Sequence, residues 1–180
     1  TDAIADAILL TCMKEGPFAL TNPTDYTCRA NIMCAGTLAH NDLTGCGTTG
    51  DWATHNIEHE LSGLFDVSHG AGLAAVWGSW ARYTRNENLP RFERFAHNVM
   101  GIDTTNMSDM EASDAGIKAM EQFFRSIGMP TDIHTLVGKD ITDAEIEEMA
   151  QKCTNGDTTT IGGLKILHAA DIVKIYQMAK

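Results

Sequence analysis

Long apolar runs, basic clusters and paired cysteines are all missing from this sequence of 180 residues. The longest apolar run, near Gly72–Trp77, is far shorter than the roughly 20 residues that a membrane-spanning helix needs. The formal net charge is −11, from 13 Lys and Arg against 24 Asp and Glu. Phosphate backbones and anionic lipid surfaces are poor partners for such a chain. We therefore expect neither nucleic-acid binding nor membrane association.

The five cysteines are odd in number and never follow the C-x-x-C pattern. A disulfide framework or a thiolate zinc site is therefore not expected, and reduced thiols of a cytoplasmic protein are the plainest interpretation. The chain begins Thr-Asp-Ala, without the basic and apolar segments of a secretory signal and without an initiating Met. The expectation is a cytoplasmic protein whose chain here is processed or cut.

Alternating β-branched segments, internal repeats and low-complexity tracts are also missing. Apolar residues instead recur every three to four positions, and Gly or Pro interrupts the pattern at intervals. Helices are expected over about 2–15, 23–43, 51–63, 68–83, 90–100, 108–127 and 142–152, followed by a C-terminal helix. The predicted fold class is all-α, with seven or eight helices in one domain over residues 1–180.

The sequence does contain a concentration of histidines, because His55, His59 and His69 lie within fifteen residues. His55 and His59 are four residues apart, so on a helix they share one face. His69 follows ten residues later, beyond a turn expected at Gly63. Clustered imidazoles favour borderline metals such as Zn²⁺ and Fe²⁺ or proton transfer. Surface histidines or hydrogen-bonded core histidines are the alternative.

A competing interpretation uses the same segment. His55, Glu58 and His59 match H-x-x-E-H, the pattern of inverted zinc peptidases, in which Glu58 would be the general base of peptide hydrolysis. The five-residue pattern arises often by chance, and such peptidases need a mixed α+β frame that this sequence does not predict. A third interpretation is a non-enzymatic helical domain that packs on a partner.

Four segments carry a resemblance to a known family, namely RANIMCAGTLAHNDLTGCG, GDWATHNIEHELSGLFDVSHGAGLAAVWGSWARY, RFERFAHNVMGID and GGLKILHAADIVKIYQMA. The chain resembles the iron-dependent (group III) alcohol dehydrogenases, especially their butanol dehydrogenase-like, NAD(P)H-dependent branch. The resemblance spans nearly all of the chain, and its specific part is the H-x3-H-x9-H-G arrangement. It implies the C-terminal domain of the dehydroquinate synthase-like/iron alcohol dehydrogenase fold.

In that family an N-terminal nucleotide-binding α/β domain and a C-terminal all-α domain hold a metal between them. The ligands are an Asp and a His at D-x3-H spacing and two histidines fourteen residues apart, which His55 and His69 match. His59 matches the histidine beside the nicotinamide and the substrate, implicated in catalysis or proton relay. The resemblance thus implies Fe²⁺ or Zn²⁺ and NAD(P)H as cofactors, short-chain alcohols and aldehydes as substrates, and a homo-oligomeric intact enzyme.

Two parts of the family pattern are not found ahead of Asp51. No D-x3-H pair occurs in residues 1–50, and neither the family's G-G-G-S segment nor a βαβ pattern is found. We therefore expect the nucleotide-binding domain to be a partner that this chain lacks, with no cofactor-binding residue among these 180. For Glu58 the dehydrogenase interpretation predicts no role, and for the chain alone it predicts no turnover.

Overall fold

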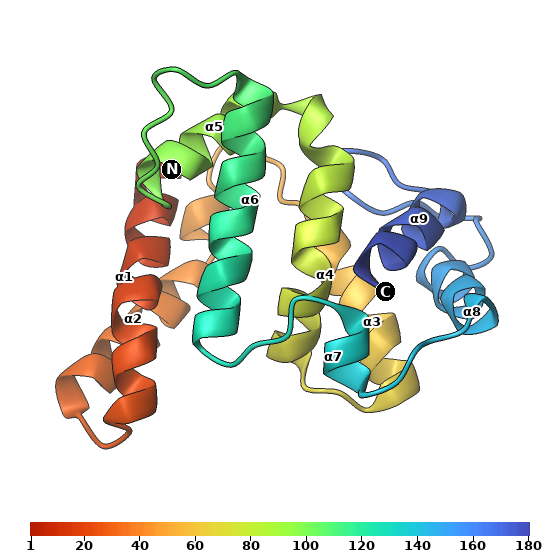
Figure 1. Cartoon of the computed structure of the whole chain (residues 1–180), viewed down its shortest axis with the longest axis horizontal. Coiled ribbons are helices and arrows are strands. Elements are labelled where there is room, and N and C mark those ends of the chain that lie inside the picture. The colour runs from red at the N-terminus through yellow and green to blue at the C-terminus, as the bar shows by residue number, and fades with distance from the viewer. The chain divides into compact units, whose positions relative to one another are not determined.

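The computed structural model describes residues 1–180, and its regular secondary structure is entirely helical apart from an isolated bridge between Ile161 and Leu167. Figure 1 shows α1 (Asp2–Thr21), α2 (Tyr26–His40), α3 (Ala53–Phe65), α4 (His69–Thr84), α5 (Leu89–Asn98), α6 (Asp109–Ser126), α7 (Ile133–Val137), α8 (Asp143–Cys153) and α9 (Ala169–Ala179). The predicted all-α class is confirmed. None of these helices combines the length and apolar character required of a membrane span.

The predicted helix count is too low by at least one because α7 has only five residues. Asp132 caps α7 by accepting a hydrogen bond from the N–H of Thr135 at 2.7 Å. Gly138, with φ 77°, ends the helix in the left-handed conformation. A helix of this length shows no apolar period, so the sequence pattern did not reveal it.

The predicted boundary between the first two helices is also wrong. Pro17 lies inside α1, and the helix continues past it until the N–H of Asn22 closes the last turn on the carbonyl of Phe18 at 2.8 Å. The proline loses its own N–H bond and crowds the preceding turn, and α1 tolerates this cost near its C-terminal end. The next helix does not start at Pro23. It starts after Asp25, whose side chain accepts from the N–H of Cys28 at 2.8 Å.

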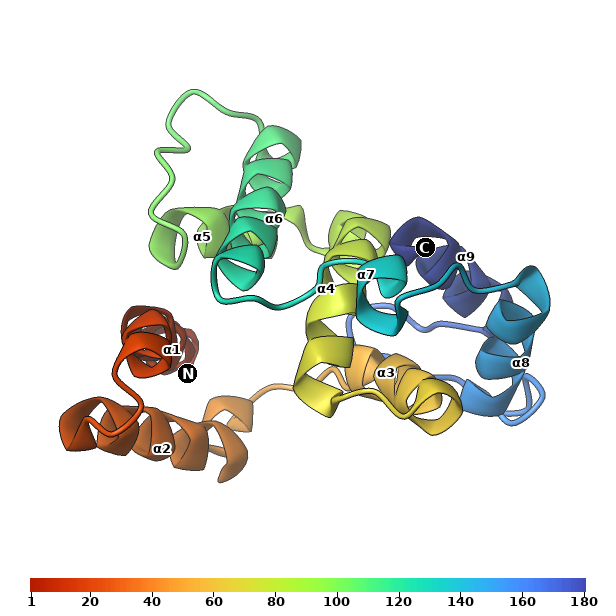
Figure 2. The same ribbon diagram turned by 60° about the horizontal axis from the view of Figure 1, so that its bottom comes forward.

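The chain divides into two compact units, of which the first comprises Thr1–Gly50 and Arg91–Ala119. Here α1 and α2 pack as a helical hairpin (Figure 2). Two arginines of α5 hold carboxylates of α1, with Arg91 bound to Asp2 and Arg94 bound to Asp6. This unit contains none of the three clustered histidines.

The second unit comprises Asp51–Pro90 and Met120–Lys180 and contains the main hydrophobic core. Ile57 and Leu61 of α3 are completely buried in this core. Tyr176 of α9 is also buried, and its hydroxyl donates to the backbone carbonyl of Ile57 at 2.6 Å. Helix α3 thus packs its apolar face against α4 and α8 and is hydrogen-bonded to α9, and its opposite face carries the histidines.

We expect Tyr176→Phe to lower the free energy of unfolding by about 1 kcal/mol, because it removes one buried hydrogen bond while keeping the aromatic ring. Urea unfolding monitored by circular dichroism measures the change. Tyr26→Phe is the matched control, since Tyr26 is exposed on α2. Equal unfolding free energies for the two variants would contradict the prediction.

Candidate metal centre

Helix α3 gathers four polar side chains on one face, at positions 55, 58, 59 and 62. An α-helix advances 100° per residue, so His55, Glu58, His59 and Ser62 fall within about one third of its circumference. The predicted alignment of His55 and His59 on a helix is therefore found in the structure. Each turn of this face offers a group that can bind a metal or move a proton.

His69 reaches this face through a tight turn between two packed helices. The turn is made by Asp66, in the left-handed conformation at φ 52°, and not by Gly63, which the structure places inside α3. Ser68 then occupies the N-cap position and His69 opens α4. Because α3 and α4 pack against each other (Figures 1 and 2), the first residue of α4 lies beside the polar face of α3.

The three imidazoles form a compact triangle. The ring centroids lie 5.4 Å apart for His55 and His69, 5.4 Å for His59 and His69, and 6.4 Å for His55 and His59. The structure thus brings together all three histidines that the sequence singled out. By distance alone His69 has two equally near imidazole neighbours, so these distances do not divide the three between ligand and catalytic roles.

Glu58 lies beside His59 and His69, with no solvent-exposed surface. One carboxylate oxygen accepts a hydrogen bond from the hydroxyl of Ser62, and the other contacts Nδ1 of His69. A metal-binding histidine commonly uses its second ring nitrogen in such a contact. Sequence reasoning missed this contact, because only the turn between α3 and α4 brings His69 to Glu58.

The donor set of this cluster fits a borderline divalent metal. Ligating atoms of Glu58, His59 and His69 lie within 4.8 Å of one another, and His55 adjoins them. Imidazole nitrogens suit iron and zinc, and clustered imidazoles with a carboxylate behind them are typical of such sites. A four-coordinate site built on two of the histidines would take its other ligands from outside the cluster.

The peptidase interpretation finds no support in this geometry. A general base must reach the water that it activates, whereas Glu58 is fully buried and both of its oxygens are engaged. The described residues also provide no sheet for the mixed frame that such peptidases use. The H-x-x-E-H match therefore arises because His55, Glu58 and His59 share one face of α3, and it does not indicate a peptidase site.

Asp51 links the N-terminal end of α3 by hydrogen bonds to a loop that is distant in the sequence. Its carboxylate accepts from the N–H groups of Ala53 at 2.8 Å, Gly163 at 3.0 Å and Leu164 at 2.8 Å. The next residue, Trp52, is 60% exposed, and its ring packs edge-on against His55 with centroids 4.8 Å apart. Asp51 thus fixes the start of the histidine helix and places an exposed aromatic ring beside the cluster.

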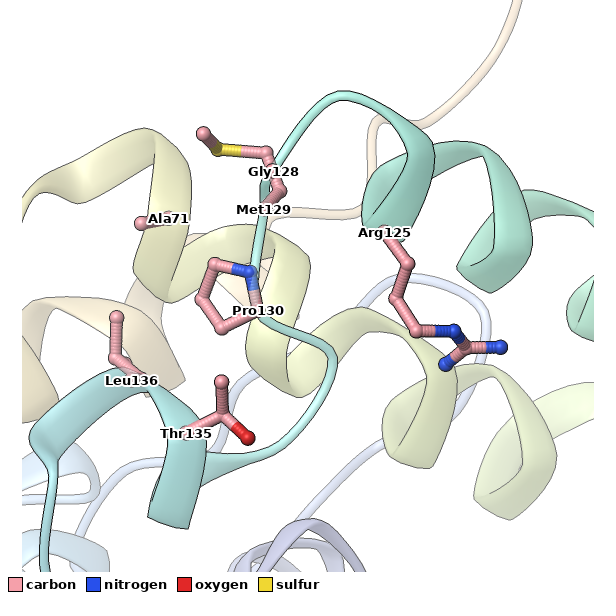
Figure 3. A pocket seen from close by; sticks show the side chains of 7 residues that line it. All are labelled: Ala71, Arg125, Gly128, Met129, Pro130, Thr135 and Leu136. Carbon is pink, nitrogen blue, oxygen red and sulfur yellow. The ribbon is translucent and has the colours of Figure 1, made fainter.

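An apolar cavity of about 440 Å³ opens beside His55, lined by Thr54, His55, Gly70, Leu73, Ala74, Trp77, Phe124, Ile127 and Met129. A second hollow of about 390 Å³ lies where α6 leads into α7 (Figure 3). Met129 lines both. None of the three clustered histidines lines the second hollow, where Arg125 lies across from Ala71 and Leu136. Only the first cavity therefore adjoins the candidate metal centre.

The family model for the C-terminal part of the Fe-containing alcohol dehydrogenase family matches residues 1–180. The NADH-dependent butanol dehydrogenase A of Clostridium acetobutylicum is 38% identical over 178 residues, which cover 98% of this chain and 44% of that protein. The NADPH-dependent aldehyde reductase YqhD of Escherichia coli is 37% identical over 175 residues, covering 94% of this chain and 45% of YqhD.

Solved structures share the fold. The substrate- and cofactor-free aldehyde reductase YqhD from E. coli superposes with a TM-score of 0.91 at 34% identity, over 99% of this chain and 46% of that chain. The NADH-dependent butanol dehydrogenase A of Thermotoga maritima gives 0.89 at 30% identity, over 99% of this chain and 45% of that chain. The chain spans about half the length of the relatives that it matches. Its helical fold, its histidine cluster and these matches show that the chain belongs to the Fe-containing alcohol dehydrogenase family and is similar to the C-terminal part of that family's proteins.

Proposed function

We propose that this chain is the metal-binding helical half of an oxidoreductase that transfers hydride between NAD(P)H and short-chain alcohols or aldehydes. The observation that carries the proposal is the convergence of His55, His59 and His69 within a family match that spans the chain. The names of its relatives agree in reaction type and differ between NADH and NADPH.

The three histidines take two roles in this proposal. His55 and His69 bind the metal, either Fe²⁺ or Zn²⁺, because they have the fourteen-residue spacing of the family's second ligand pair. When bound, the ion supplies Lewis-acid polarisation of the substrate oxygen. His59 is the catalytic residue beside the nicotinamide and the substrate, where its imidazole holds or moves the proton that accompanies hydride transfer.

The surroundings of the cluster fit a small, partly apolar substrate. The cavity beside His55 is lined mainly by aliphatic and aromatic side chains and accommodates an alkyl chain. Trp52 also lies beside His55, with its exposed ring packed against that imidazole. These groups exclude water from one side of the reacting oxygen and position the carbon chain.

The proposal requires a partner that binds the dinucleotide. The 180 residues described here contain no βαβ unit. The relatives are about twice as long as this chain, and the segment that matches it makes up less than half of each of them. We infer that an N-terminal nucleotide-binding domain, bringing an Asp and a His at D-x3-H spacing, completes the site. The intact enzyme is expected to be a homo-oligomer.

The test compares this chain alone with the complete product of its gene. Each protein is purified, its iron and zinc contents are measured, and the oxidation of NADH and NADPH is followed with short aldehydes such as butanal. We expect turnover from the complete product only, because in this proposal the N-terminal domain binds the dinucleotide.

Two results would count against this function. One is a complete gene product that contains no nucleotide-binding domain and no D-x3-H pair ahead of this chain. The other is a metal-loaded complete product that oxidises neither nicotinamide with any short alcohol or aldehyde.

A further inference from the structure

Glu58 is an acidic residue in the interior, and it stands outside the set of ligands proposed above. Its side chain is completely buried, although the adjacent His69 is half exposed. Burial of an unpaired carboxylate is costly, so such groups persist where hydrogen bonds or charges compensate them. Both carboxylate oxygens of Glu58 have such a partner.

The two partners of Glu58 differ in what they can do. Ser62, one helical turn further along α3, donates its hydroxyl to one oxygen and anchors the carboxylate. Nδ1 of His69 meets the other oxygen. A carboxylate can only accept, so this contact favours the imidazole tautomer with hydrogen on Nδ1 and leaves Nε2 as the nitrogen available to a metal.

Gly72 creates the space that the carboxylate occupies. A Cβ atom at Gly72 would lie 2.5 Å from Oε1, 2.7 Å from Cγ and 2.9 Å from Cδ of Glu58, which real Cβ atoms do not tolerate. Gly63, within α3, would meet nothing within 4 Å. Gly72 is therefore a glycine because α4 must approach the Glu58 side chain closely.

We propose that Glu58 is a positioning residue of the metal site, held by Ser62 and Gly72, that fixes the tautomer and ring orientation of His69. This inference rests on the proposed role of His69 as a ligand. Outer carboxylates of this kind raise the basicity of a ligating imidazole, and their loss typically costs about 10- to 100-fold in metal affinity.

The experiment uses Co²⁺ as the probe in the complete gene product. Its dissociation constant is measured by chelator competition, and its visible d–d absorption reports ligand geometry. Glu58→Gln keeps the size of the side chain, and Gly72→Ala displaces the carboxylate without changing any polar group. Gly63→Ala is the matched control, since it adds the same methyl group to a helical glycine with open space around it.

We expect Glu58→Gln and Gly72→Ala each to weaken Co²⁺ binding by about 10- to 100-fold and to alter the d–d spectrum. Gly63→Ala should match the unmodified protein in both measurements. His69→Ala, which removes the proposed ligand itself, should lose more affinity than either. Thermal unfolding of each metal-free variant identifies folded protein, and the near-isosteric Glu58→Gln decides the matter if Gly72→Ala does not fold.

A second readout needs no metal. Long-range ¹H–¹⁵N correlation spectra of the metal-free protein, at alkaline pH where an ordinary imidazole is neutral, report which nitrogen of His69 carries hydrogen. The unmodified protein should show hydrogen on Nδ1. In Glu58→Gln the amide can donate to Nδ1, so this tautomer should lose its preference, which a purely structural role for Glu58 would not cause.

The outcomes separate this inference from the proposed function. Unchanged affinity, spectrum and tautomer in Glu58→Gln, beside lost binding in His69→Ala, would overturn the positioning role alone. A loss in Glu58→Gln as large as that in His69→Ala would make Glu58 a ligand and also overturn it. Unchanged binding in His69→Ala would overturn both proposals.

Discussion

His69→Ala and His55→Ala are each expected to reduce the metal affinity of the complete gene product by at least about 100-fold. The rate of NAD(P)H oxidation should fall together with the metal content. The physical reason is the small number of ligands that a protein supplies to iron or zinc, so that losing one imidazole leaves an incomplete coordination sphere. Removal of an outer partner already costs about 10- to 100-fold, and a direct ligand should cost more. Metal content after dialysis and the rate of NAD(P)H oxidation measure the two effects.

His59→Ala should give a different result from the same measurements. A catalytic histidine that handles a proton contributes about 10²- to 10⁴-fold to the rate. We therefore expect kcat to fall by that order while the metal content stays at the level of the unmodified protein. This contrast separates the two roles for imidazoles that lie equally far from His69.

His134→Ala is the control for this series, since His134 lies on α7 and pairs with Asp140 at 2.7 Å on the surface. It should leave metal content and kcat unchanged. Loss of metal in His59→Ala with retention in His55→Ala would exchange their roles. Full metal content and turnover in both His55→Ala and His69→Ala would refute the assignment.

Leu61→Ala is expected to lower the free energy of unfolding by about 2–5 kcal/mol, the largest stability effect of any change considered for this chain. Leu61 is completely buried on the face of α3 opposite the histidines. Truncation removes three buried carbon atoms and leaves a cavity in a core that relaxes only partly. Equilibrium unfolding in guanidinium chloride, monitored by circular dichroism, gives the value.

Met178→Ala provides the comparison, because Met178 is a large apolar residue of the same unit that is 48% exposed on α9. We expect its effect to stay within about 0.5 kcal/mol. If Leu61→Ala also changed the free energy of unfolding by only about 0.5 kcal/mol, the core around α3 would be able to collapse into the space left by the side chain. That result would also mean that α3 is not held rigidly along its apolar face.

Local helix signals were the most predictable part of the fold. The capping box of Thr142 and Glu145 starts α8 where the sequence placed it, because its hydrogen bonds lie within one turn. The same holds for Ser108 and Glu111 ahead of α6. Pro17 misled the prediction, since a proline near a helix end forfeits one hydrogen bond, which the rest of α1 can tolerate.

By itself the sequence determined the helical class and the alignment of His55 and His59, because residue spacing alone sets which side chains share a helix face. It also carried the family resemblance that singles out His69. Only the tertiary structure decided that His69 meets Glu58, that Gly72 gives this carboxylate its space, and that an apolar cavity opens beside His55. Those contacts depend on how α4 packs against α3, and the direction of the turn at Asp66 is not written in any spacing along the chain.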